Sequence, residues 1–182
     1  MTAPFRSPDD QAPLAVVVMG VAGCGKTAIG EAIAELLDAE FIEGDRLHPA
    51  ENVARMARGV PLTDEDRAGW LDAVGAAIAS ANARGRGAIA ACSALKRGYR
   101  DRLRAQAPGL VFVHPVVDKE TARQRVAQRK GHFMPASLVD SQFAILEPLQ
   151  PDESAFALDG SEPVDALVGE TVRRLRHETE SA

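Results

Sequence analysis

The sequence predicts an α/β fold in which a parallel sheet is covered by helices on both faces. Short apolar runs that are typical of strands alternate with helical patterns along the whole chain. The first run, from Leu14 to Met19, is continuously apolar and rich in valine, as expected of a strand that is buried on both faces. A glycine-rich turn then leads directly into the first helical pattern, so the chain begins as strand, loop and helix.

The remaining elements follow in the same alternating order. Strands are expected at residues 14–19, 40–43, 88–92, 110–113 and 155–158. Helices are expected at about 26–37, 50–58, 64–84, 135–146 and 164–176, with further helical patterns after the third and fourth strands. Thr63 is expected to cap the longest helix, since the acidic side chains that follow it suit the positive end of a helix dipole. Pro135 suits the first turn of another helix.

Length and composition indicate one folded domain. The chain has 182 residues, of which 46% are hydrophobic and 26% are charged, so it has room for one core. Residues 1–13 are rich in proline and poor in apolar groups, and we expect a flexible tail there, followed by a single domain over 14–182.

Charge and cysteine content indicate which partners are excluded and in which cellular compartment the protein is expected. The net charge of -5 gives no basic field that would hold a nucleic acid. No apolar run is long enough to cross a bilayer, so no membrane partner is expected. Two cysteines, Cys24 and Cys92, are too few for a disulfide scaffold, which favours reduced thiols and a cytoplasmic location.

The turn after the first strand carries a phosphate-binding motif. Residues 20–27 read G-V-A-G-C-G-K-T, which matches the G-x-x-x-x-G-K-[ST] pattern of a P-loop in the strand–loop–helix context that this pattern requires. Backbone N–H groups of the loop would point at phosphate oxygens, Lys26 would bridge the terminal phosphates, and Thr27 would offer its hydroxyl to Mg²⁺. The expected nucleotide-binding residues here are Gly20, Gly23, Cys24, Gly25, Lys26, Thr27 and Ala28. An ordinary glycine-rich turn is the alternative.

Other motifs separate a kinase from other nucleotide enzymes. Neither Asn52 nor Asn82 is followed by lysine, so the guanine-specific N-K-x-D loop of GTPases is absent. No strand ends in the acidic pair expected of water-activating ATPases. Asp118, after the fourth strand, is either a carboxylate on the magnesium side or a cap for the helix that follows.

Polar residues after the second and third strands predict an acceptor site at the same edge of the sheet. Asp45 could orient or accept the proton of an attacking hydroxyl, and His48 could bind other hydroxyls. Lys96 and Arg100 could grip an anionic acceptor. The alternatives are a turn aspartate, a surface histidine and a solvated helix face.

Arg125 and Arg129 are spaced to share one helix face, where like charges repel unless a ligand or carboxylates neutralise them. We therefore expect a closing lid that brings these arginines onto nucleotide phosphates, with Gly131 as its hinge.

Together, GVAGCGKT, GDRLHPAENVARMARGVPLTDEDRAGWL, ACSALKRGYRD and RKGHFMPASLVDSQFAILEP resemble the gluconate kinase family of small P-loop kinases, from about Val16 to Pro148. The resemblance implies a three-layer P-loop fold with a helical lid, related to shikimate and nucleoside monophosphate kinases. It implies transfer of the γ-phosphate of ATP to the 6-hydroxyl of D-gluconate, and commonly a homodimer. The acceptor segment would then span about 45–70, and the lid about 125–150.

Matched positions imply the roles of individual residues. Lys26, Asp45 and Arg129 would be catalytic, and Arg125 and Arg129 would be the lid arginines on the nucleotide. The implied acceptor residues are Asp45, His48, Lys96, Arg100, His132 and Gln142. Ala22 and Cys24 stand where many family members carry serine, but both retain the backbone N–H groups.

Two other functions remain open at this point. Shikimate, which also pairs a carboxylate with hydroxyls, would suit much of the same crevice. A slow ATPase that acts as a binding or switch module is a different class, and Asp45 separates the two, because a switch needs no base beside an acceptor hydroxyl.

Overall fold

The computed structural model describes residues 13–128, 135 and 137–180. Within these residues, five strands form one fully parallel sheet in the order β2-β3-β1-β4-β5. The strands are β1 (Ala15–Val18), β2 (Glu40–Glu43), β3 (Ala88–Ala91), β4 (Val111–Val116) and β5 (Ala155–Asp159). This architecture confirms the predicted α/β fold and all five expected strands. β4 extends beyond the apolar run seen in the sequence, because His114, Pro115 and Val116 also pair with β5.

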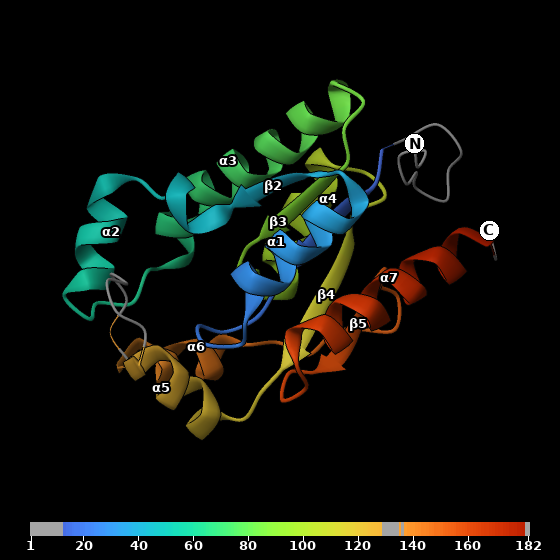
Figure 1. Ribbon diagram of the computed structural model, residues 1–182. Coiled ribbons are helices and arrows are strands. Elements are labelled where there is room, and N and C mark those ends of the chain that lie inside the picture. The colour runs from blue at the N-terminus through green and yellow to red at the C-terminus, as the bar shows by residue number, and fades with distance from the viewer. Residues whose placement is uncertain (1–12, 129–134, 136, 181–182) are drawn as a thin grey trace.

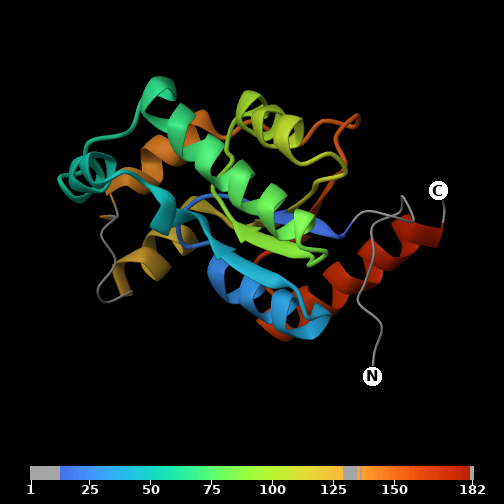
Figure 2. The same ribbon diagram turned by 90° about the horizontal axis from the view of Figure 1, so that it is seen from above.

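Helices cover both faces of the sheet, as expected (Figures 1 and 2). α1 (Lys26–Leu37) and α7 (Val164–Glu180) lie on one face, and α3 (Asp64–Ala83) and α4 (Arg97–Gln106) lie on the other. The alternating side chains of β1 follow this division. Val16 and Val18 pack in the cluster that contains residues of α1 and α7, whereas Val17 packs in the cluster that contains residues of α3 and α4.

Local sequence explains where two of these helices begin. Thr63 precedes α3 and forms the predicted cap: Asp66 N–H donates to Thr63 Oγ1 at 3.2 Å, and Thr63 N–H donates to Asp66 Oδ2 at 2.8 Å. α1 begins differently, since its N-cap is Gly25, which offers no side chain to the first-turn N–H groups. The start of α1 is therefore open to an external acceptor.

The other helical segments gather near the carboxyl ends of the strands (Figure 1). They are η1 (Gly44–Leu47), α2 (Ala50–Ala57), α5 (Lys119–Gln128) and α6 (Ser137–Ile145). A hydrophobic cluster separate from the two sheet cores joins Val21 and Cys24 of the β1–α1 loop to Ala122 and Val126 of α5 and Val139 of α6. None of the helices in the described part of the chain combines the length and apolar character needed to cross a membrane.

Candidate active site

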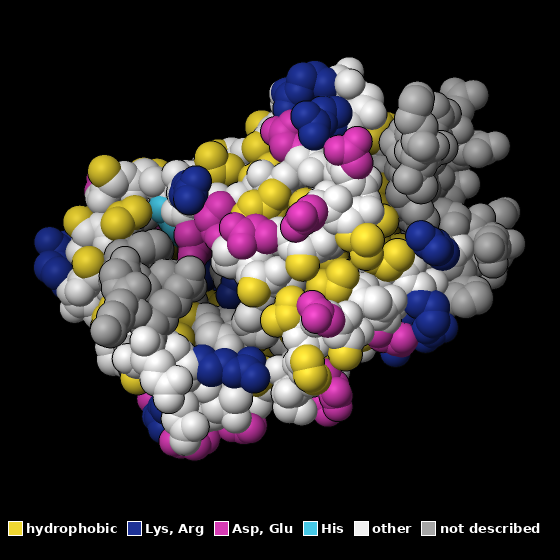
Figure 3. Space-filling model, viewed as in Figure 1, with side chains coloured by type: hydrophobic (Ala, Val, Ile, Leu, Met, Phe, Trp, Pro, Cys, Tyr) yellow, Lys and Arg dark blue, Asp and Glu magenta, His cyan; other side chains and the backbone are white. Residues whose placement is uncertain are grey.

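A pocket of about 500 Å³ lies at the edge of the sheet where the parallel strands end. Its walls come from the β1–α1 loop, α1, η1, α2, α3 and the two helices α5 and α6. Figure 3 shows it as a hollow, with acidic side chains gathered at one margin and basic side chains at the opposite margin. The lining residues Glu31 and Asp45 supply carboxylates, and Lys26, Arg67 and Arg125 supply cations.

The β1–α1 loop is shaped to receive phosphate. Gly23 has a φ of 84°, and a Cβ at this position would lie 2.5 Å from the Ala122 carbonyl oxygen, so only glycine fits beneath α5. Gly25 has a φ of 97° and leaves the first turn of α1 without a side-chain cap or an acidic residue. Lys26 Nζ donates to Val21 O at 2.8 Å. These donors fit the polyphosphate of a nucleotide.

The hydroxyl expected to bind Mg²⁺ is held by a carboxylate. Thr27 Oγ1 donates to Glu43 Oε2 at 2.8 Å, and Glu43 is the last residue of β2. The described residues include no cluster of three or more His, Cys, Asp or Glu side chains that could hold a metal ion. This donor set fits Mg²⁺ that takes most of its oxygens from phosphate and water, with Thr27 as a protein ligand. Sequence reasoning missed Glu43, although it directly precedes the Gly44-Asp45 pair.

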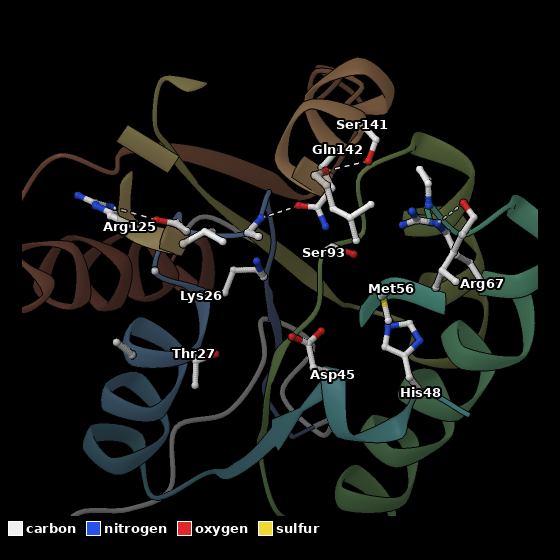
Figure 4. A pocket seen from close by; sticks show the side chains of 18 of the residues that line it. Lys26, Thr27, Asp45, His48, Met56, Arg67, Ser93, Arg125, Ser141 and Gln142 are labelled. Atoms are coloured by element: carbon white, nitrogen blue, oxygen red, sulfur yellow. Dashed lines mark hydrogen bonds between the residues drawn. The ribbon is translucent and has the colours of Figure 1, made fainter. Parts of the chain in front are cut away.

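Asp45 and His48 lie together in the pocket, as the sequence predicts. Trp70 supports both of them: its Nε1–H donates to Gly44 O at 2.7 Å, directly before Asp45, and its ring stacks on that of His48 with centroids 4.1 Å apart. In Figure 4 the Asp45 carboxylate lies between the end of the pocket with Lys26 and Thr27 and the end with His48 and Arg67. Asp45 is thus placed where a hydroxyl could approach a phosphate.

His48 is neutral at neutral pH. Burial lowers its pKa from 6.5 to about 4, against the opposing effect of Asp45 and with help from Arg67. Among the described residues, its buried Nδ1 atom has no hydrogen-bond partner. A neutral imidazole in this position can form a hydrogen bond with a hydroxyl of an acceptor.

Arg67 is a pocket cation that sequence reasoning missed. It begins the buried face of α3 that continues with Trp70 and Leu71, and it is only 7% exposed. Its Nε donates to Leu62 O at 3.3 Å, and the side chain lines the pocket near His48. An arginine in phase with an apolar helix face was the available signal, because burying a charge there without a partner is costly.

The structure does not bring Arg100 and Lys96 into the pocket lining, contrary to expectation. Arg100 is completely buried and donates through Nε and Nη2 to Glu153 at 2.7 and 2.8 Å. Lys96 Nζ contacts both carboxylate oxygens of Asp64, at 2.8 and 2.9 Å. The sequence showed two cations after a strand end but gave no sign of these carboxylates, which lie 53 and 32 residues away along the chain.

The other expected residues divide into three groups. Gly23, Gly25, Ala28, Arg125 and Gln142 line the pocket with Lys26 and Thr27, whereas Gly20 and Cys24 do not. Cys24 is buried, and its Sγ contacts Met19 O at 3.7 Å. Arg129 and His132 lie outside the described residues. Asp118 caps α5 by accepting a hydrogen bond from Thr121 N–H at 2.8 Å, so it serves as a helix cap.

Lys26 and Arg125 form one cationic end of the pocket, and Arg67 forms the other. Arg125 Nη1 and Nη2 donate to Gly160 O at 3.2 and 3.1 Å, and Nη1 also lies 3.4 Å from Gly23 O beside the phosphate loop. A carboxylate between two cationic ends suits a reaction in which a polyphosphate transfers a phosphoryl group to an anionic hydroxy compound.

Comparison with known proteins identifies close relatives of this arrangement. A family model described as an AAA domain matches residues 16–149. The chain is 42% identical to a gluconokinase of Gluconobacter oxydans, with 91% of this chain and 93% of that protein covered. It is 47% identical to the thermosensitive gluconokinase of Escherichia coli, over 75% of this chain and 73% of the other.

Two solved structures, a gluconokinase and a sugar kinase, also resemble this chain in fold and sequence. A gluconokinase from Sinorhizobium meliloti superposes with a TM-score of 0.82 at 44% identity, over 92% of this chain and 94% of that one. An unliganded sugar kinase from Janibacter superposes with a TM-score of 0.86 at 45% identity, over 90% and 95% of the two chains.

Proposed function

The chain belongs to the gluconokinase family of P-loop kinases, and from this membership we propose that it transfers the γ-phosphoryl group of ATP to the 6-hydroxyl of D-gluconate. The products are 6-phospho-D-gluconate and ADP. The observation that carries the proposal is the position of Asp45, between the phosphate loop at one end of the pocket and His48 and Arg67 at the other.

Each end of the pocket has a distinct part in the reaction. The N–H groups at the start of α1, Lys26 and Arg125 bind the phosphates of ATP. The gluconate 6-hydroxyl lies against Asp45, its oxygen bonds to the γ-phosphorus as the bond to the bridging oxygen of ADP breaks, and its proton passes to the Asp45 carboxylate. Lys26 stabilises the charge that develops on the transferred group. Arg129, outside the described residues, is part of the proposal as a second phosphate-binding lid arginine.

Arg67 makes the acceptor site selective for an acid over a neutral sugar. Its guanidinium donates only to a backbone carbonyl among the described residues, so its charge is available to the C1 carboxylate of gluconate. His48, held neutral by burial, serves a hydroxyl between the two ends of the acceptor. A neutral sugar would leave the buried Arg67 charge without an anion, which disfavours its binding.

Mg²⁺ is included in the proposal, with Thr27 as its protein ligand and Glu43 as the carboxylate that orients the Thr27 hydroxyl. When bound, the ion would neutralise charge on the β- and γ-phosphates. The family also supports a cytoplasmic homodimer, with an acceptor segment near 45–70 and a lid near 125–150.

ADP release in a coupled assay tests the proposal. The assay compares gluconate, other aldonates, shikimate, nucleoside monophosphates and glucose at equal concentrations. We expect turnover with gluconate to exceed turnover with every other acceptor. Equal background ADP release with all acceptors would instead identify a slow ATPase.

Asp45→Asn tests the base. We expect kcat to fall by at least about 100-fold while ATP still binds, because the variant keeps the shape of the side chain and loses its basicity. Asp38→Asn, at the far end of α1, is the matched control and should retain full activity. Near-normal turnover in Asp45→Asn would remove Asp45 from the mechanism.

A further inference from the structure

Gln142 contacts the phosphate loop directly. It lies on α6, is 6% exposed, and its Oε1 accepts a hydrogen bond from the backbone N–H of Ala22 at 2.6 Å. The two residues are 120 positions apart, so this hydrogen bond ties the loop to a distant part of the chain. Only the carbonyl oxygen of a glutamine amide can accept from an N–H, which fixes the orientation of the side chain.

Other contacts between the same elements support the loop from the same side. The Ala122 carbonyl of α5 lies so close to Gly23 that no side chain would fit there. Val21 and Cys24 share a buried apolar cluster with α5 and α6 that is separate from both cores of the sheet. The loop is therefore packed against the α5–α6 pair rather than suspended in solvent.

From these contacts we propose that Gln142 is a positioning residue for the phosphate loop, which it holds in the curved form that receives nucleotide. The inference rests on the proposed function only in assigning nucleotide to this loop. Gln142 accepts the hydrogen bond of the Ala22 N–H from α6, so the loop need not rotate to find an acceptor for it. The following N–H groups, at the start of α1, then remain directed at the ligand.

This assignment differs from acceptor binding, which is the role that the resemblance implies for Gln142. A residue that touches gluconate would affect gluconate binding and leave nucleotide binding unchanged. A residue that holds the loop would weaken nucleotide binding even when no acceptor is present.

The first experiment measures amide hydrogen exchange and ADP affinity in Gln142→Met, without gluconate. Methionine keeps the approximate length of glutamine and removes the acceptor. We expect the Ala22 amide to exchange at least about tenfold faster and the Kd for ADP to rise about five- to tenfold. Gln142→Glu keeps an oxygen at the same place and should retain the slow exchange of the Ala22 amide.

Gln124→Met is the matched control. Gln124 lies exposed on α5, and among the described residues its side chain bonds only to Glu120, so this variant should match the unmodified chain in Ala22 exchange and ADP affinity. Because ADP binding and amide exchange need no acceptor, they report on Gln142 even if gluconate proves not to be the substrate.

Two results would overturn the proposal. One is a rise in the KM for gluconate in Gln142→Met with unchanged ADP affinity and unchanged Ala22 exchange, which would make Gln142 an acceptor-binding residue. The other needs no variant and holds even if Gln142→Met does not fold: an Ala22 amide in the unmodified, nucleotide-free chain that exchanges as fast as an unprotected amide.

Discussion

Two groups of cations in this molecule have opposite surroundings. The pocket cations are Lys26, Arg67 and Arg125, and the α4 cations are Arg97, Arg100 and Arg104 of α4 together with Lys96, its N-cap residue. Each pocket cation donates to backbone carbonyl oxygens, and none has a carboxylate within ion-pair distance among the described residues. Each α4 cation contacts at least one Asp or Glu within 3.0 Å.

This difference shows which cations are available to a ligand. A carbonyl oxygen satisfies a donor but does not cancel its charge, so the pocket cations still attract an anion. A carboxylate does cancel the charge, so the α4 cations stabilise the fold and are not available to a ligand. Glu153 shows the strength of these ion pairs. Burial raises its pKa, but hydrogen bonds from Arg100 and Arg104 outweigh that effect and hold the pKa at about 2.

The largest expected effect is on activity at a pocket cation. Lys26→Met should lower kcat/KM by about 1,000-fold with little change in thermal stability, because it removes the positive charge that stabilises the transferred phosphoryl group but breaks no ion pair. Steady-state kinetics and a thermal melt measure the two properties. Lys119→Met, the same change at an exposed position on α5, should keep normal activity. Unchanged turnover in Lys26→Met would contradict the assignment of the phosphate loop.

The next largest effect is on stability at an α4 cation. Arg100→Met should lower the free energy of unfolding by about 3 kcal/mol, because it leaves Glu153 buried without its main partner. Urea unfolding measures the loss, and the KM for each substrate should stay within about twofold in the folded protein. Arg100→Met combined with Glu153→Gln should recover part of the stability. A selective rise in the KM for gluconate would restore Arg100 to the acceptor site.

At Arg67, in contrast to Arg100, we expect an effect on acceptor binding rather than on stability. Arg67→Met should raise the KM for gluconate by about 50-fold and leave the KM for ATP unchanged, since it removes a charge-assisted contact to a carboxylate. Arg102→Met, which removes an exposed arginine paired with Asp72, is the matched control. A loss of stability without any change in the KM for gluconate would place Arg67 with the α4 cations instead.

His114 is affected by one cation of each group, Lys26 and Arg100, and should make the stability of the protein depend on pH. Burial, with smaller contributions from the charges of Lys26 and Arg100, lowers its pKa from 6.5 to about 4. Between pH 6.5 and 4 the unfolded chain binds a proton that the folded chain does not, so the free energy of unfolding falls as the pH is lowered, by about 2 kcal/mol at pH 5 from this group. His114→Gln should reduce the loss between pH 7 and pH 5 by that amount in urea titrations. An identical pH dependence in this variant would show that His114 titrates normally.

The smallest effect is expected at Lys96. Its ion pair with Asp64 is partly exposed, and Lys96→Met should change the KM for gluconate by less than about threefold. Initial rates over a range of gluconate concentrations measure it. A tenfold rise would show that Lys96 leaves Asp64 for the acceptor during binding.

Local sequence was enough for the elements and for the phosphate end of the pocket. Strand–loop–helix order and the G-x-x-x-x-G-K-T pattern are contiguous, so Lys26 and Thr27 were placed by neighbours in the chain. The cap at Thr63 was equally local, because its partner lies three residues away.

The acceptor end depended on pairs that are distant in sequence. The sequence suggests a ligand for Arg100, because its real partner, Glu153, is 53 residues away and cannot be recognised as its partner from the sequence. Arg67 is not recognised from the sequence, because it lies on an otherwise apolar helix face and only the fold turns its side chain into the pocket. Residue type predicts which side chains carry charge. Only the tertiary structure decides whether that charge is cancelled.

The stacking of His48 on Trp70 has an optical consequence. Trp70 is the only tryptophan in the chain, so the tryptophan emission of the protein comes from one ring beneath the acceptor end of the pocket. A molecule that touches His48 alters the surroundings of that ring, whereas a nucleotide confined to the phosphate loop does not contact it. The chain therefore carries an intrinsic fluorophore that can follow occupation of one half of its site separately from the other.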